Sequence, residues 1–182
     1  WSGVERLATG EVDEITVAGP TATDEYFRRP EATAAAKIRE RLADGSERVV
    51  HRMGDLGWFD ADGRLWFCGR KSHRVEASDG PLYTEQVEPI FNTHPAVRRT
   101  ALVGVGPRGA QRPALCVELL ARASRREREA IEAGLMQLGG EHPQARRVQR
   151  VLFHPRFPVD IRHNAKIGRE KLAIWAARKL GA

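Results

Sequence analysis

Three short segments carry side chains that could bind the hydroxyl or anionic groups of a ligand. Asp55 has glycines on both sides within residues 52–57, and an ionised carboxylate there could accept two hydrogen bonds from a diol. Arg70 follows Gly69 where the charge balance of the chain changes, which suits a contact with an anion. Lys166 lies on a polar segment before a terminal helix, where its ammonium group would be a compact, accessible cation. Considered one at a time, these residues are better explained as an Asx turn, a surface arginine and a solvated lysine.

Other catalytic patterns are missing from the sequence. Residues 104–109 match GxGxxG, but Pro107 and the residues after it start no helix, so a glycine-rich turn is the better explanation. There is no GxSxG elbow, and the six histidines show no HExxH spacing. Cys68 and Cys116 provide neither a CxxC metal site nor a disulfide framework. We therefore expect no metal site, no hydrolase chemistry and a reducing, cytoplasmic location.

The composition indicates a folded chain with an uneven distribution of charge. With 41% hydrophobic and 30% charged residues, the 182-residue chain can bury a core. No run approaches the roughly 18 apolar residues of a transmembrane segment. Residues 1–70 hold 10 basic and 13 acidic side chains, whereas residues 71–182 hold 20 basic and 11 acidic ones. This change of sign predicts two units, the second matched to an anionic ligand or partner.

A basic nucleic-acid-binding module is the alternative from another functional class. High pI and clustered arginines would be its electrostatic footprint. However, the basic side chains of residues 125–129 alternate with Glu127 and Glu129, and no aromatic stacking pattern or zinc-finger spacing accompanies them. We therefore expect that the chain has no nucleic-acid partner.

The first 70 residues are expected to be mostly β-structure. A strand is predicted over residues 12–17, and a short helix over residues 30–36 because Pro30 opens a run of strong helix formers. Asp44-Gly45 is typical of a hairpin turn, here between strands at 37–43 and 47–53. A second hairpin is predicted around residues 60–63.

From residue 71 onward strands and helices alternate, which indicates a small α+β domain. Helices are predicted over residues 84–92, over 124–139 behind a capping box of Ser124 and Glu127, and over 169–180. Strands are predicted over residues 74–77, 97–105, 114–121 and 147–153. Residues 158–166 are expected to form an irregular polar loop.

Together and in this order, the segments resemble the late motifs of the AMP-forming adenylating superfamily, which includes acyl-CoA synthetases, peptide-synthetase adenylation domains and luciferases. Residues 19–33 resemble its GP…GY…PEAT segment, residues 52–57 its RTGDLG motif, and residues 158–166 its closing proline-to-lysine motif. Gly69-Arg70 resembles the arginine that opens the family's hinge. The resemblance implies that residues 1–70 end a large N-terminal adenylating domain and that residues 71–182 form a mobile C-terminal α+β lid. The opening Trp1-Ser2-Gly3 fits this interpretation as a start inside a larger protein.

The resemblance also implies a role for each candidate residue. Asp55 would bind the ribose hydroxyls of ATP, and Arg70 would contact the ribose and phosphate region. Lys166 would be the catalytic lysine of adenylation, bridging the substrate carboxylate and the α-phosphate. ATP, Mg²⁺ and a fatty carboxylate are thus the implied ligands, and the missing N-terminal part of the protein is the implied partner.

Departures from the family pattern indicate which branch of the superfamily the chain resembles. The hinge position is Ser72, where the family usually has Asp or Lys, and Asn164-Ala165 precede Lys166 in place of Ser-Gly. Glu76 and Asp79 lie where typical members bind coenzyme A, and like charge there would disfavour that polyanion. Residues 158–167 resemble the branch of bacterial long-chain olefin biosynthesis, whose members adenylate a β-hydroxy acid and close it to a β-lactone without CoA. Other enzymes of that hydrocarbon pathway would be partners, and an ordinary fatty acyl-CoA synthetase is the alternative.

Overall fold

The computed structural model describes residues 3–160 and 163–181. It divides into two compact units, Trp1–Ser72 and His73–Ala182. The sequence-based interpretation of these units as the end of an adenylating domain and a lid remains a prediction. Ile161 and Arg162, which belong to the closing motif, lie outside the described residues.

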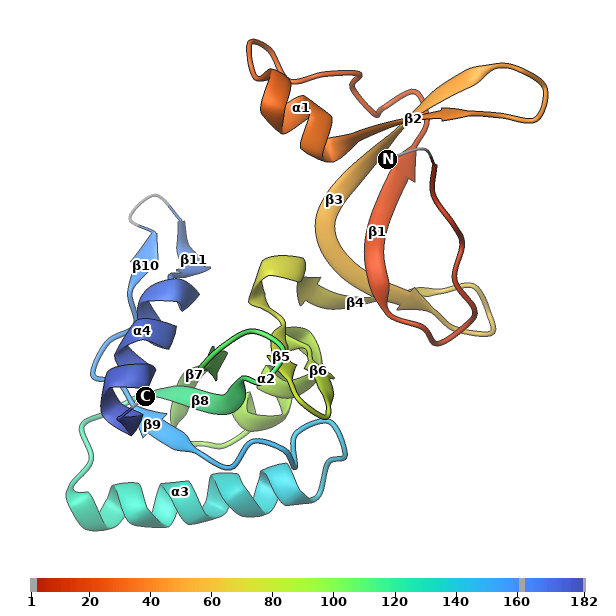
Figure 1. Cartoon of the computed structure of the whole chain (residues 1–182). Coiled ribbons are helices and arrows are strands. Elements are labelled where there is room, and N and C mark those ends of the chain that lie inside the picture. Colours follow the sequence, from red (N-terminus) through yellow and green to blue (C-terminus); the bar gives the residue numbers. More distant parts are fainter. Residues whose placement is uncertain (1–2, 161–162, 182) are drawn as a thin grey trace. The chain divides into compact units, whose positions relative to one another are not determined.

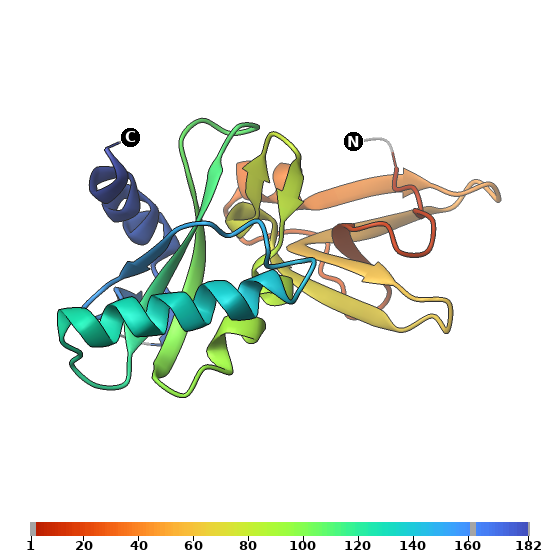
Figure 2. The same ribbon diagram turned by 90° about the horizontal axis from the view of Figure 1, so that it is seen from below.

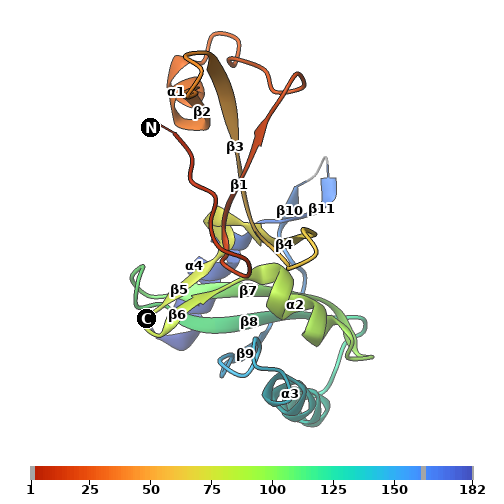
Figure 3. The ribbon, with the colours of Figure 1, turned by 90° about the vertical axis from the view of Figure 1, so that its right-hand side faces the viewer.

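The first unit is an antiparallel sheet with one short helix. Its strand order is β1-β3-β2, and β4 pairs with the far end of the long β3. Figure 3 shows α1 beside β2 at one end of β3 and the β4 pairing at the other. Its elements are β1 (Asp13–Ala18), α1 (Pro30–Ala36), β2 (Lys37–Arg41), β3 (Glu47–Phe59) and β4 (Leu65–Arg70), followed by the 3-10 turn η1 (Lys71–His73). The predicted strand, helix and both hairpins of this unit are confirmed.

The second unit is built on a three-stranded sheet of order β7-β8-β9, in which β7 and β8 are antiparallel and β9 is parallel to β8. β5-β6 and β10-β11 form two separate two-stranded sheets (Figure 1). Helices and strands are both present, and the strand pairing is mostly antiparallel with a single parallel crossover, β8-α3-β9, so the α+β class is confirmed. The elements are β5 (Val75–Ala77), β6 (Gly80–Leu82), α2 (Thr84–Asn92), β7 (Val97–Val105), β8 (Arg112–Leu119), α3 (Arg125–Gly140), β9 (Val151–Phe153), β10 (Val159–Asp160), β11 (His163–Ile167) and α4 (Arg169–Leu180).

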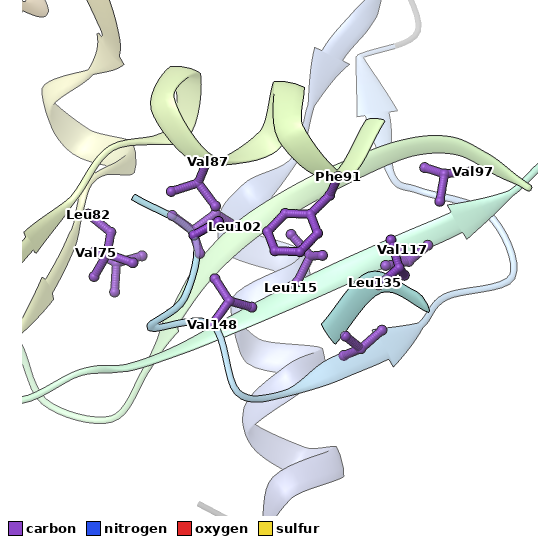
Figure 4. Packing of buried hydrophobic residues seen from close by; sticks show 12 residues of the cluster. Val75, Leu82, Val87, Phe91, Val97, Leu102, Leu115, Val117, Leu135 and Val148 are labelled. Atoms are coloured by element: carbon purple, nitrogen blue, oxygen red, sulfur yellow. The ribbon is translucent and has the colours of Figure 1, made fainter. Parts of the chain in front are cut away.

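Successive side chains of β7 and β8 point to opposite faces of the sheet and bury two separate apolar clusters. On one face Leu102 and Leu115 pack with Val87 and Phe91 of α2 and Leu135 of α3 (Figure 4). On the other face, β7 and β8 pack against Leu172 and Ala176 of α4. The strand residues in this contact are small or β-branched: Ala101, Val103, Val105, Ala114 and Cys116. The sheet therefore has α2 and α3 on one face and α4 on the other (Figure 2).

Two predictions for the second unit were wrong: one strand is shorter than predicted, and one predicted loop contains strands. The strand predicted over residues 147–153 is limited to β9, because the backbone before it is in turns: the N–H groups of Ala145 and Arg146 bond the carbonyl oxygen of His142, and the N–H of Val148 bonds that of Ala145. Residues 158–166 were expected to form an irregular loop, but they contribute the strands β10 and β11, which pair between Val159 and Ile167. The polar composition of this segment hid the strand, since no alternation of apolar side chains marks it.

Candidate functional site

Asp55 and Arg70 face each other across the β3-β4 pair. The register of the two strands makes them direct cross-strand partners, and the Arg70 Nε atom lies 3.0 Å from Asp55 Oδ1. Gly54, immediately before Asp55, has a φ of +69°, a left-handed conformation that favours glycine. The register of β1 against β3 also shifts at this point, so residues 53–55 bulge out of the ladder with β1. The backbone conformation of this bulge thus explains why a glycine precedes Asp55.

The Asp55 carboxylate keeps an acceptor atom with no donor. Its Oδ1 atom is buried and accepts no hydrogen bond from the described residues, although the Arg70 charge lies beside it. Arg70 directs its Nη1 atom instead to the carbonyl oxygen of Met53 at 3.2 Å, and 57% of its side chain is exposed. A buried oxygen without a donor is costly unless a ligand supplies one. This geometry fits a hydroxyl-bearing ligand with an anionic group near Arg70.

Glu14, which the sequence analysis did not single out, organises the same end of the first unit. Its carboxylate accepts hydrogen bonds from Arg52 Nη2 at 2.6 Å, Lys71 Nζ at 2.8 Å and the backbone N–H of Gly54 at 3.2 Å. Burial tends to raise the pKa of Glu14, but the hydrogen bonds and charges of Lys71 and Arg52 hold it below its ordinary value. The Glu14 carboxylate thereby links β1 to the bulge before Asp55 and to Lys71. Its partners are 38 to 57 residues away, so no local pattern could have indicated them.

Lys166 is exposed on β11, in the second unit, whereas Asp55 and Arg70 belong to the first. The predicted site residues are therefore divided between two units. Gly168 follows β11 and donates its backbone N–H to the carbonyl oxygen of Pro158 at 2.7 Å, which closes the hairpin before α4 begins. Lys166 thus stands on a paired strand and not on the loop that its polar surroundings predicted.

A buried ion pair anchors the chain three residues after Lys166. Arg169 contacts Glu88 of α2 with both terminal nitrogens, with an Nη2–Oε2 distance of 2.9 Å, and Glu88 Oε1 also accepts the N–H of Leu102 in β7. The two side chains are only 13% and 8% exposed. Burial raises the pKa of Glu88, while the Arg169 guanidinium acts in the opposite direction. The pair ties α2, β7 and the first residue of α4 together, and so fixes the base of the Lys166 hairpin.

Ser72, the predicted hinge residue, lies in η1 and is the last residue of the first unit. Lys71 before it is held by Glu14 within that unit, as described above. The position of Ser72 at the boundary is compatible with a hinge, and its motion stays a prediction.

Glu76 and Asp79, which were expected to repel coenzyme A, are both paired with arginines in the structure. Glu76 is bound by Arg74, with Nη2–Oε1 at 2.8 Å, and its pKa is lowered by the hydrogen bond from that arginine. Asp79 is paired with Arg147. Each carboxylate therefore carries a compensating cation, and the face is not a net acidic barrier to a polyanion.

The described residues supply neither a metal-ligand cluster nor a membrane span. Across residues 3–160 and 163–181 no group of three His, Cys, Asp or Glu side chains could hold a metal ion. No helix in the same ranges is long and apolar enough to cross a membrane. Cys68 and Cys116 are both buried and unbridged, and burial raises the pKa of the Cys116 thiol to about 12, so it is unreactive in the folded state.

The fold of the chain is that of known adenylating enzymes. An amide bond synthetase from Marinactinospora thermotolerans superposes with a TM-score of 0.70 at 28% identity, over 94% of this chain and 32% of that one. An o-succinylbenzoate coenzyme A synthetase from Bacillus subtilis, solved with ATP and a magnesium ion, has the same fold at 23% identity, with a TM-score of 0.70 over 92% of this chain and 32% of that one. In sequence and fold, the chain resembles the C-terminal portion of AMP-forming adenylating enzymes.

One group of relatives is much more similar. The chain is 68% identical over 179 residues to an olefin beta-lactone synthetase from Xanthomonas campestris pv. campestris. The alignment covers 98% of this chain and 32% of the relative, so the chain spans about a third of that protein's length. No family model matches the chain.

Proposed function

We propose that this chain is the C-terminal part of an enzyme that adenylates a β-hydroxy fatty acid with ATP and closes the product to a β-lactone. The observation that carries this proposal is the 68% identity over 98% of the chain to an olefin beta-lactone synthetase. The remainder of the adenylating domain, and other enzymes of a hydrocarbon pathway, are its proposed partners, and the cytoplasm is its proposed location.

The first unit would hold the nucleotide. The buried Oδ1 atom of Asp55 lacks a donor, and a ribose hydroxyl would supply one. Arg70, beside this oxygen and more than half exposed, could reach the adjoining phosphate. Mg²⁺ is the proposed companion of ATP, but the described residues offer no cluster to bind it, so its ligands would come from the triphosphate and from other parts of the enzyme.

The second unit would supply the adenylation lysine. Attack of a carboxylate on the α-phosphate brings two anions together, and negative charge accumulates as the bond forms. An ammonium group held between them stabilises the transition state more than the separate reactants. Lys166 is exposed on a strand whose base is clamped by Arg169 and Glu88, so its ammonium can be presented with little reorganisation. Rotation about Ser72 would bring it to the nucleotide and take it away again.

Lactone closure would follow without a second ligand. The β-hydroxyl is attached to the same molecule as the activated carbonyl, so its oxygen can attack that carbon and expel AMP. Tethering of this kind can supply a large effective concentration, on the order of 10⁵ M or more for well-oriented groups.

An ordinary fatty acyl-CoA synthetase is the second candidate, and the pairing of Glu76 and Asp79 favours it. Because Arg74 and Arg147 neutralise these carboxylates, the structure provides no electrostatic reason against coenzyme A. The two candidates differ in their products, so they can be separated directly.

The decisive experiment is a chimera in which this chain replaces the matching third of the Xanthomonas campestris relative. The chimera is incubated with a β-hydroxy fatty acid, ATP and Mg²⁺, with and without coenzyme A, and the products are identified by mass spectrometry. We expect AMP and a β-lactone in both cases. Formation of a coenzyme A thioester faster than any lactone would establish the second candidate instead.

Lys166→Ala in the chimera should lower kcat for pyrophosphate release by roughly 10²–10³-fold and leave ATP binding nearly unchanged, because the contact acts mainly in the transition state. Lys171→Ala is the matched control, since Lys171 is an exposed lysine on the adjacent helix α4. Equal pyrophosphate release by the two variants would remove Lys166 from the mechanism.

A further inference from the structure

A cavity lies at one edge of the three-stranded sheet of the second unit. The beginning of β7, the end of β8 and the end of β9 meet at this edge, because β7 runs antiparallel and β9 parallel to β8. The loop between β8 and α3 and the residues after β9 complete the walls. The cavity has a volume of about 540 Å³, which is within the range of small-molecule sites. None of its lining residues has a role in the proposed adenylation.

The cavity is strongly basic. Four arginines line it: Arg98, Arg122, Arg128 and Arg156. Arg98 lies 3.6 Å from Glu118. For the other three, no ion pair or hydrogen bond from the guanidinium group is found among residues 3–160 and 163–181.

Glu118, the one acidic residue of the lining, does not balance this charge. It is 5% exposed and is already engaged by Arg99, at 2.9 Å, and by the backbone N–H of Phe157 at 2.8 Å. Three exposed arginines without a carboxylate partner among the described residues thus line one hollow. Such a concentration of positive charge favours an anionic ligand.

Apart from His154, the remaining wall is apolar. Leu119, Leu120, Phe153 and Pro155 contribute to it, and Leu120 is 63% exposed. An exposed leucine beside unpaired arginines suits a ligand with a charged head and an apolar tail, and does not suit a bare ion.

We propose that this cavity binds a phosphomonoester group carried on an apolar chain. A phosphate presents close to two negative charges and three acceptor oxygens, and can therefore engage several guanidinium groups at once, often in bidentate geometry. A carboxylate has one charge and two acceptor oxygens, so it would compensate the three arginines less completely than a phosphate. The same chemistry is found in a soluble alkyl phosphate and in the head group of phosphatidic acid.

The test is calorimetric titration of the 182-residue chain at low salt with octyl phosphate, inorganic phosphate and vesicles containing phosphatidic acid. Octyl phosphate should bind measurably and at least tenfold more tightly than inorganic phosphate. Binding of octyl phosphate together with vesicles would indicate a lipid source, and binding of octyl phosphate alone a soluble one. Equal affinity for inorganic phosphate, binding of vesicles only, or no binding at all would overturn the proposal.

Variants locate the site. Arg122→Ala, Arg128→Ala and Arg156→Ala should each weaken octyl phosphate binding about tenfold, the usual loss for one charge-assisted hydrogen bond. Arg125→Ala is the matched control, because Arg125 begins the same helix as Arg128, is 94% exposed and does not line the cavity. All four residues are on the surface, and circular dichroism would establish that the variants fold. A loss of affinity as large for Arg125→Ala as for the others would show general charge attraction and refute the site.

Discussion

The ion pair between Arg169 and Glu88 should be essential for the stability of the second unit. Arg169→Ala would leave the Glu88 carboxylate, 8% exposed, without its cation and with only the Leu102 N–H as a donor. Breaking a buried pair by removing one partner typically costs about 3–5 kcal/mol, because the remaining charge is uncompensated. For a unit of this size that corresponds to a fall in melting temperature of at least about 12 °C.

The same variant should become less unstable as the pH falls. Burial already raises the folded-state pKa of Glu88, and removing Arg169 takes away the largest influence that lowers it. The folded variant then binds a proton at pH values where the unfolded chain does not. Stability therefore increases on acidification from pH 8 toward pH 5, by up to about 1.4 kcal/mol per pH unit, and decreases as pH rises through the folded pKa.

The assay is urea unfolding followed by circular dichroism at pH 5 and pH 8. Arg178→Ala is the control, because Arg178 is an exposed arginine in the last turn of the same helix, and it should change the free energy of unfolding by less than about 1 kcal/mol. A double variant, Arg169→Ala with Glu88→Gln, should recover part of the loss. A cost for Arg169→Ala below about 1 kcal/mol with no pH dependence would refute the reasoning.

Three further outcomes test other parts of the structure. A methyl group at Gly57 would lie 2.8 Å from the backbone oxygen of Trp66, so Gly57→Ala should lower the melting temperature, while Gly140→Ala, with nothing within 4 Å, should be neutral or slightly stabilising. The Cys116 thiol should react with a thiol reagent at pH 8 only after denaturation, and fast labelling of the native chain would contradict its burial. Retention on an oligonucleotide column should disappear at moderate salt, whereas micromolar binding at physiological salt would revive the nucleic-acid alternative.

The sequence predicted elements where neighbouring residues determine the structure. Ser124 and Glu127 form the expected capping box, and the hairpin at Asp44-Gly45 has the expected turn. The helix over residues 169–180 was found with its predicted bounds, with Leu172 fully buried.

The sequence did not reveal contacts between distant residues. Arg169 and Glu88 are 81 positions apart, and Asp79 and Arg147 are 68 apart. A charged residue in a sequence shows no partner, and its pairing depends on which strands and helices the fold brings together. For this reason Glu76 and Asp79 suggested a repulsive surface when taken alone, whereas in the structure each is neutralised by an arginine.

The central position of β8 limits how its backbone amides can exchange with solvent. It is paired on one edge with β7 and on the other with β9, and both of its faces are covered, so Ala114, Leu115, Cys116 and Val117 are fully buried. No local opening can expose its amide protons to solvent without separating the two apolar clusters. Hydrogen exchange at these four amides should therefore occur only through complete unfolding of the unit, and its rate would report the global free energy of unfolding.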